Sequence, residues 1–272
     1  MRGHRQHSVS YVISHMKYLK NAYGIEGFYI FDELFNAKKE WIYYFCDEIE
    51  KNKLDIFYLI VGARVHNIDE KMLQRLKETG CIEIGYGQES GSDRILKEYY
   101  KGVTSQQNKK VTLLTTKKIG IHSPVQLVIG APGETSETIK ENIQFLKDLE
   151  AYTYSLNYLI PLPETPIWKQ VESYGLVPDL EEYLDLVAEH GGMPLVNLTK
   201  VPDNEWGKWS ILIKKEIQLY YYKKKNRKAL YYIYKSFYTM LALLLSIIPL
   251  HSFKKVFPNK LTQFVTIIRN KL

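Results

Sequence analysis

Residues 82–91, IEIGYGQESG, decide the fold, because they join a strand pattern to a polar turn. Apart from Glu83, residues 82–87 have the apolar, aromatic or small side chains typical of a strand that is covered on both faces. The residues Gln88, Glu89, Ser90 and Gly91 follow at once, so their polar groups lie at the carboxyl end of that strand. We therefore expect a parallel sheet whose chemistry lies where this strand ends.

The same alternation of strand and helix patterns extends in both directions from this stretch. Parallel neighbours need a crossover connection, so the alternation indicates right-handed βαβ units. Periodicity alone leaves an open doubly wound sheet and a barrel as alternatives. The predicted strands are residues 27–31, 56–63, 82–87, 125–130 and 152–160, and the predicted helices are 9–23, 37–51, 69–79, 93–100, 105–119 and 136–149.

Polar or turn-forming residues follow each predicted strand. Because parallel strands open onto one face at their carboxyl ends, we expect these groups to converge there. The plain alternative is that strands end in loops and loops are polar. The groups are Asp32 with Glu33, Arg64, residues 88–91, residues 131–134 and residues 161–163.

Composition narrows the class of protein. The chain has 272 residues, 45% of them hydrophobic, which is enough to bury a core of its own. Two cysteines, Cys46 and Cys81, are too few for a disulfide framework and indicate a reducing, cytoplasmic environment. The first residues lack the apolar core of a secretory signal.

The positive charge is concentrated at the carboxyl end. From Lys200 onward, 15 lysines and arginines face three acidic residues. Residues 179–190 and 206–238 have helical patterns, and 236–250 are uncharged but shorter than the ~20 residues of a membrane span. We expect this tail either to lie on a membrane surface, as a peripheral contact, or to pack as a helix on the body. We expect no contact with nucleic acid.

Several motifs occur in a recognisable order. They are GFYIFDELF, GARVHNIDEKMLQRLKETGC, GYGQESGSDRILKEYYKGVT, VIGAPGET and YLIPLPETPIW. Together they resemble the core domain of radical S-adenosylmethionine (radical SAM) enzymes, and the cobalamin-associated branch in particular. The resemblance implies a partial (β/α) barrel in residues 1–176, without its first strand, and a helical extension in residues 177–272.

The resemblance also implies which residues bind S-adenosylmethionine. Carboxylates are natural acceptors for its ammonium group, and an arginine suits its carboxylate. Alternatives remain open, since Arg64 suits a surface ion pair, Gly130 and Gly133 suit a plain turn, and Glu134 suits a helix start. The implied cofactor-binding residues are Asp32, Glu33, Arg64, Glu89, Ser90, Gly130, Gly133, Glu134, Leu159 and Pro161.

One family feature is missing from this sequence. Radical SAM enzymes hold a [4Fe-4S] cluster on Cys-x3-Cys-x2-Cys, and the two cysteines here, Cys46 and Cys81, do not form that motif. We therefore expect no metal ligands in this chain and no cobalamin-binding domain. A separate chain or an upstream segment would have to carry the cluster motif.

These observations give two functional hypotheses. The first is the carboxyl-terminal portion of a radical SAM enzyme, from a truncated or split protein, that binds the cofactor but is inactive alone on its unknown substrate. The second is a non-catalytic barrel remnant that docks on a partner or a membrane. In either case the strand at residues 27–31 is expected to be an open sheet edge that favours oligomers or aggregates.

Overall fold

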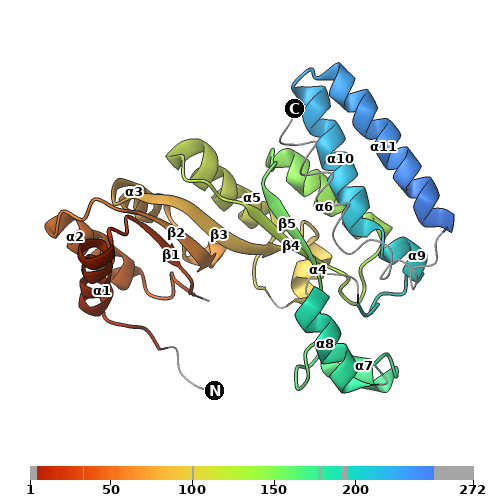
Figure 1. Ribbon diagram of the computed structural model, residues 1–272, viewed down its shortest axis with the longest axis horizontal. Helices are drawn as coiled ribbons and strands as arrows, with labels where there is room; N and C mark the ends of the chain where they lie inside the picture. The colour runs from red at the N-terminus through yellow and green to blue at the C-terminus, as the bar shows by residue number, and fades with distance from the viewer. Residues whose placement is uncertain (1–4, 33, 100, 178, 191–194, 248–272) are drawn as a thin grey trace. The chain divides into compact units, whose positions relative to one another are not determined.

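A computed structural model describes residues 5–32, 34–99, 101–177, 179–190 and 195–247 (Figure 1). Its five strands form one sheet in the order β1-β2-β3-β4-β5, and the pairs β1–β2, β2–β3 and β3–β4 are parallel. The backbone N–H of Val125 donates to the carbonyl of Thr153, and that of Leu159 to Ile129. The strands are β1 (Gly27–Ile30), β2 (Phe57–Ala63), β3 (Cys81–Glu89), β4 (Val125–Ile129) and β5 (Tyr154–Tyr158).

Helices connect and follow these strands. Those within the repeating part are α1 (Val9–Tyr23), α2 (Lys39–Lys51), α3 (Glu70–Glu78), α4 (Asp93–Glu98), α5 (Ser105–Leu113) and α6 (Ser136–Asp148), with short helical turns η1 (Val65–Asn67) and η2 (Leu114–Ile119). The later helices are α7 (Trp168–Ser173), α8 (Leu180–His190), α9 (Asp203–Trp206), α10 (Trp209–Lys224) and α11 (Lys228–Ile247). The alternation of strands and helices expected from the sequence is therefore confirmed.

Local signals account for where the helices begin and end. The Ser8 side chain accepts a hydrogen bond from the Tyr11 N–H, and Gly24 ends α1 in the left-handed conformation, with φ 68°. The Asp69 side chain caps α3 in the same way, by accepting from the Met72 N–H at 2.9 Å. These caps lie at the positions that the sequence pattern marks as helix boundaries.

Two predicted helices differ from the structure. The pattern over 105–119 gives α5 followed by a wider π-helical turn, in which the hydroxyls of Thr115 and Thr116 donate back to the carbonyls of Val111 and Thr112. Such back-bonding competes with the regular helix ladder. The pattern over 206–238 breaks into three helices, and Asn226 takes φ 53° within a run of basic residues between α10 and α11. Repulsion among these basic side chains disfavours a continuous helix, and asparagine tolerates the left-handed backbone of the break.

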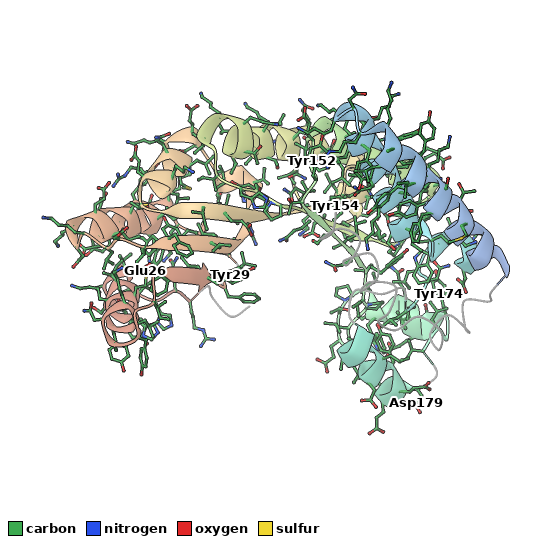
Figure 2. The ribbon with its side chains drawn as sticks, turned by 45° about the horizontal axis from the view of Figure 1, so that its top comes forward. Glu26, Tyr29, Tyr152, Tyr154, Tyr174 and Asp179 are labelled. Atoms are coloured by element: carbon green, nitrogen blue, oxygen red, sulfur yellow. The ribbon has the colours of Figure 1, made fainter. Side chains whose placement is uncertain are left out.

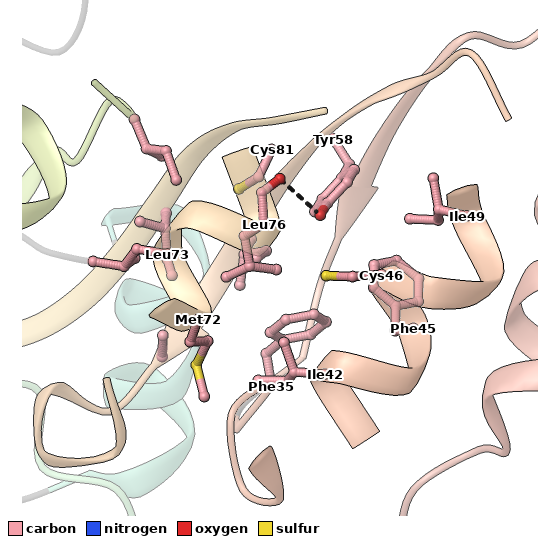
Figure 3. Packing of buried hydrophobic residues seen from close by; sticks show 14 of the residues in the cluster. Phe35, Ile42, Phe45, Cys46, Ile49, Tyr58, Met72, Leu73, Leu76 and Cys81 are labelled. Atoms are coloured by element: carbon pink, nitrogen blue, oxygen red, sulfur yellow. Dashed lines mark hydrogen bonds between the residues drawn. The ribbon is translucent and has the colours of Figure 1, made fainter. Parts of the chain in front are cut away.

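One hydrophobic core joins α1, α2 and α3 to the first three strands. Figure 3 shows Phe35, Phe45 and Tyr58 packed among aliphatic side chains of α2 and α3. Phe45 lies edge-on to both other rings, with centroids 6.0 Å from Phe35 and 5.6 Å from Tyr58. The Tyr58 hydroxyl reaches the Leu76 carbonyl at 3.2 Å and Thr79 at 2.8 Å, so this polar group is satisfied inside the core. This core thereby holds the first three strands against α1, α2 and α3.

The chain groups into two compact units. The first contains residues 1–128 and 140–156, and the second contains residues 129–139 and 157–272. Within the second, Trp168, Val171, Tyr183, Val196 and Leu198 form a separate small core. The division at residues 176 and 177, where the barrel pattern ends in the sequence, stays a prediction.

Among the residues that the structure describes, no helix has both the length and the apolar character needed to cross a membrane.

Candidate functional site

A cavity of about 610 Å³ opens in the first unit. Its walls come from the carboxyl ends of β1, β2 and β3 and from the loop after α4, which is where the sequence predicts the chemistry. It therefore brings together three of the predicted site residues: Asp32, Arg64 and Glu89. The lining residues are Phe31, Asp32, Val61, Gly62, Ala63, Arg64, Val65, His66, Gly87, Glu89, Tyr99, Lys101, Val103 and Gln126.

Asp32 is the acidic group that follows β1. Its Oδ1 accepts the Leu34 backbone N–H at 2.8 Å, which is the geometry of an Asx turn. This bond fixes the carboxylate close to its own backbone, at the end of the strand. Glu33, the neighbouring predicted site residue, lies outside the residues that the structure describes.

Arg64 is positioned through its backbone by Asn36. The buried Asn36 side chain donates to the Arg64 carbonyl at 2.8 Å and accepts from the Arg64 N–H at 2.8 Å. The backbone carbonyl of Asn36 also accepts a hydrogen bond from Asn67 Nδ2, at 3.1 Å. Asn36 therefore bonds to both ends of the turn after β2. Asp69, five residues later in the chain, forms its ion pair with Lys39 and not with Arg64, with 2.7 Å between Nζ and Oδ2. The exposed guanidinium of Arg64 therefore stands at the cavity wall.

Glu89 ends β3 with an unusual backbone. Its φ is +62°, a left-handed value that costs a non-glycine residue about 1–2 kcal/mol. A Cβ at Gly87 would lie 2.7 Å from Glu89 Oε1, so a side chain there would displace the carboxylate of Glu89. Strained residues of this kind concentrate at functional sites. Glu89 thus combines a left-handed backbone with a place in the cavity lining.

Lys101 is the direct partner of Glu89. Its Nζ lies 2.8 Å from Glu89 Oε1, and the two side chains are 38% and 20% exposed. The lysine belongs to the loop after α4, so this loop contributes a cation to the cavity wall. A ligand with a cationic group would compete with Lys101 for the same carboxylate.

Residues on either side of Glu89 lock the turn and do not line the cavity. Gln88 is buried on the opposite face of β3, where its Oε1 accepts the Gln126 N–H at 3.0 Å. The Ser90 hydroxyl is also buried and donates to Asn142 Oδ1 at 3.0 Å, and the same oxygen accepts from the Gly91 N–H at 2.6 Å. The structure thus places Ser90 in the support of the turn, and its predicted contact with a cofactor stays a prediction.

The second unit contains the turn of Gly130, Gly133 and Glu134. Both glycines have positive φ, 94° and 80°. Glu134 is buried, and its Oε2 accepts from the Gly130 N–H and, at 3.1 Å, from the Ala131 N–H. This carboxylate therefore shapes the turn from within, and a direct cofactor contact of these three residues stays a prediction.

Leu159 and Pro161 follow β5 in the same unit. Leu159 is partly buried against the small core around Trp168. The Pro161 carbonyl accepts the hydroxyl proton of the buried Tyr183 at 2.8 Å. Both residues therefore have structural contacts within this unit. Their predicted contact with the cofactor stays a prediction.

Some residues that line the cavity were not predicted from the sequence. Gln126 alternates with the buried Val125 and Leu127, so a polar residue inside an apolar strand was an available signal. Lys101 gave no such signal, because it lies in a loop, 12 residues beyond the glutamate that it binds. His66 was likewise hidden in the turn after β2.

No metal site forms among the described residues: they contain no group of three histidine, cysteine, aspartate or glutamate side chains that could hold an ion. Cys46 and Cys81 are unpaired and buried in the main core. Burial raises the pKa of the Cys46 thiol and raises that of Cys81 to about 12. Iron-sulfur clusters bind thiolates, so these two buried, protonated thiols do not fit the cluster of the resembled family.

Comparison with protein families identifies the class of this fold and site. Residues 1–146, more than half of the chain, match the radical SAM superfamily. The chain therefore belongs to that superfamily, and the expected family resemblance is confirmed.

Individual relatives show the same likeness. An uncharacterised methyltransferase of Pyrococcus horikoshii is 34% identical over 61% of this chain and 36% of its own length. The anaerobic magnesium-protoporphyrin IX monomethyl ester cyclase of Rubrivivax gelatinosus is 26% identical over 67% of this chain and 33% of its own. The chain thus spans about a third of the length of these curated relatives.

Solved structures confirm the predicted fold class, a partial (β/α) barrel of the radical SAM type. The cobalamin-dependent radical SAM enzyme OxsB, with aqua-cobalamin and S-adenosylmethionine bound, matches 96% of this chain and 45% of its own, with a TM-score of 0.54 and 18% identity. The methyltransferase TsrM of Kitasatospora setae, with cobalamin and a [4Fe-4S] cluster bound, matches 63% of this chain and 35% of its own, with a TM-score of 0.55 and 21% identity.

Proposed function

We propose that this chain binds S-adenosylmethionine in the cavity of the first unit, for radical chemistry on a substrate still to be found. One observation carries the proposal: Asp32, Arg64 and Glu89 line the same cavity. The ligand has a cationic ammonium and sulfonium at one end and a carboxylate beside them. Two carboxylates and one guanidinium offer matching charge-assisted hydrogen bonds.

The size of the cavity supports the proposal. Its volume of about 610 Å³ lies within the range usual for small-molecule sites. Gly62 and Gly87 leave parts of the wall without side chains, so a ligand can approach the backbone there. In the superfamily, the bound cofactor supplies a 5′-deoxyadenosyl radical that removes a hydrogen atom from substrate.

In this proposal, the residues of this chain bind S-adenosylmethionine and orient it. Asp32 and Glu89 would accept hydrogen bonds from the cationic end of the ligand, and Arg64 would donate to its carboxylate. Lys101 neutralises Glu89 before binding and moves aside when a ligand ammonium takes its place. The strained Glu89 backbone keeps the carboxylate aimed at the ligand, so little ordering is left to occur on binding.

The cluster part of the chemistry needs cysteines from elsewhere. The sequence contains two cysteines, and both lie in the core. We propose that a separate chain or a preceding segment supplies the cluster ligands, and that cobalamin, if used, is held by another domain. This chain alone then binds the cofactor without cleaving it.

A cytoplasmic location belongs to the same proposal. Cys46 and Cys81 are both unpaired, as is usual in a reducing compartment.

Equilibrium dialysis with labelled S-adenosylmethionine tests the binding. Glu89→Gln and Arg64→Met should each weaken affinity on the order of tenfold, since each removes a charge-assisted hydrogen bond. Glu98→Gln, an exposed position at the end of α4 outside the cavity, is the matched control and should bind normally. Failure of the unaltered chain to bind, or equal binding by all variants, would refute the proposal.

Anaerobic reconstitution with iron and sulfide tests the second part. We expect no 5′-deoxyadenosine from this chain alone, measured by chromatography. A stable cluster with cofactor cleavage would show that the cluster ligands lie within this sequence after all.

A further inference from the structure

The hairpin of α10 and α11 in the second unit carries a concentrated positive charge. Figure 1 shows the two helices lying side by side, and they pack against each other. Their connection is the run KKKNRK, and all five of its basic side chains are exposed. Helix α11 itself contains no aspartate or glutamate, so it offers no acidic side chain to balance this charge.

An apolar stripe on α11 is exposed next to this charge. Tyr232, Ile233 and Met240 are 64%, 57% and 55% exposed. Together with Ala229 and Ser236 they recur at intervals of three and four residues, so they share one face of the helix. A helix of a water-soluble protein usually turns such a face inward.

The other face of α11 is the one that packs. The ring of Tyr234 packs against that of Tyr222 of α10 in a tilted arrangement, with ring centroids 5.0 Å apart. Tyr238 lies next to Tyr234, with ring centroids 6.2 Å apart, and burial raises its pKa to about 12. The exposed stripe is therefore distinct from the face of α11 that packs against α10.

We propose that this hairpin docks reversibly on an anionic lipid surface. The basic connection would lie among lipid phosphates, and Tyr232, Ile233 and Met240 would enter the boundary between headgroups and acyl chains. This arrangement of a cationic cluster beside an apolar helix face is that of an interfacial helix. Lipid fits better than nucleic acid, because phosphates alone leave isoleucine and methionine side chains in water.

Flotation of the full chain with vesicles tests the proposal. Vesicles of phosphatidylcholine alone are compared with vesicles that also contain phosphatidylglycerol. We expect binding to the anionic vesicles, weakened by raising salt, and little binding to the neutral ones. Binding to neither kind, or equal binding to both, would overturn the proposal.

Three variants, all at exposed positions, separate the contributions of the basic connection and of the apolar stripe to vesicle binding. Lys223→Gln, Lys225→Gln and Lys228→Gln together should weaken binding about 100-fold, since each basic residue contributes about fivefold at the surface. Combined Tyr232→Ser, Ile233→Ser and Met240→Ser should weaken it at least about tenfold through lost apolar area. The control, Lys97→Gln with Lys110→Gln and Lys169→Gln, lowers the net charge equally on other exposed helical positions and should bind normally.

Other outcomes have clear meanings. Equal weakening by the control would show a general charge effect and overturn the assignment to the hairpin. Loss through the lysine variant but not the stripe variant would overturn the role of the apolar face. Tight binding of a nucleic acid duplex that competes with vesicles would replace lipid as the occupant. Circular dichroism of each variant checks that the helices are intact.

Discussion

At the scale of single residues, Glu89 combines backbone strain with the candidate chemistry. Its left-handed φ of +62° is a conformation that glycine adopts without penalty, yet a carboxylate stands there. Under the proposed function, this backbone would hold the carboxylate where it binds the cofactor.

Glu89→Gly should separate stability from binding. Removing the left-handed penalty offsets the loss of the partly exposed ion pair with Lys101, so the free energy of unfolding should not fall. Affinity for S-adenosylmethionine should fall about tenfold or more. Urea denaturation and equilibrium dialysis measure the two effects.

Lys53 provides the matched control. It also has positive φ, 49°, and lies outside the cavity on an exposed turn. Lys53→Gly should stabilise the chain by about 0.5–1 kcal/mol and leave cofactor binding unchanged. A marked destabilisation by Glu89→Gly would show that its strain is not the dominant effect.

Cys81 gives a prediction on pH. Burial raises its pKa to about 12 in the folded chain, whereas an unfolded thiol ionises near pH ~8.5. The folded state therefore keeps a proton that the unfolded state loses, and stability should decrease as pH rises from about 8.5 toward 12. Urea denaturation across this range measures the slope.

Cys81→Ala should make that slope shallower. Native Cys81 should also react slowly with a thiol reagent at pH 8, because the thiolate is scarce and the side chain is buried. Rapid native labelling, with the fold intact, would contradict the buried position.

At the scale of elements, Gly80 fixes how α3 passes into β3. Its φ is +99°, and a Cβ there would lie 2.2 Å from the Ile56 carbonyl oxygen, a backbone atom that cannot turn away. Gly24, at the end of α1, also has positive φ but has nothing within 4 Å of a Cβ.

The two glycines should therefore respond differently to alanine. Gly24→Ala should cost about 1 kcal/mol for the left-handed backbone alone. Gly80→Ala adds a collision with backbone and should cost about 3 kcal/mol or more. Urea midpoints of the two variants give the comparison, and equal losses would mean that the strand start shifts to accept the methyl group.

The elements also show what a sequence can predict. The strands and helix caps depend on local periodicity and on Ser8, Gly24 and Asp69, all of which are visible in the sequence. The bond from Asn36 to Arg64 joins residues 28 apart, and the pair of Glu89 with Lys101 depends on the path of a loop. Such contacts follow from tertiary packing, which no local pattern encodes.

At the scale of the whole molecule, β1 is the edge of the described sheet. Its pairing neighbour is β2, and it lies first in the strand order. Tyr29, labelled beside this strand in Figure 2, is 60% exposed, and Phe31 just after it is 83% exposed. An aromatic edge with unpaired backbone groups favours association with another strand.

Light scattering at micromolar concentration should therefore show oligomers or aggregates. Tyr29→Lys should lower the association, because a charge on an edge strand opposes pairing. Tyr44→Lys is the control, since Tyr44 is 50% exposed but lies on α2. A stable monomer of the unaltered chain would contradict this prediction.

The hydroxyl of Tyr158 has a practical consequence for anyone who shortens this protein. It donates to the Trp206 carbonyl at 2.9 Å and accepts from the Ser210 N–H at 3.2 Å, while its ring packs edge-on against the Trp206 indole. A polypeptide that stops near residue 200 would keep β5 but lose both hydrogen-bonding partners and the ring beside it. Helices α9 and α10 therefore help to hold β5, and a useful truncation point lies after α10 rather than before α9.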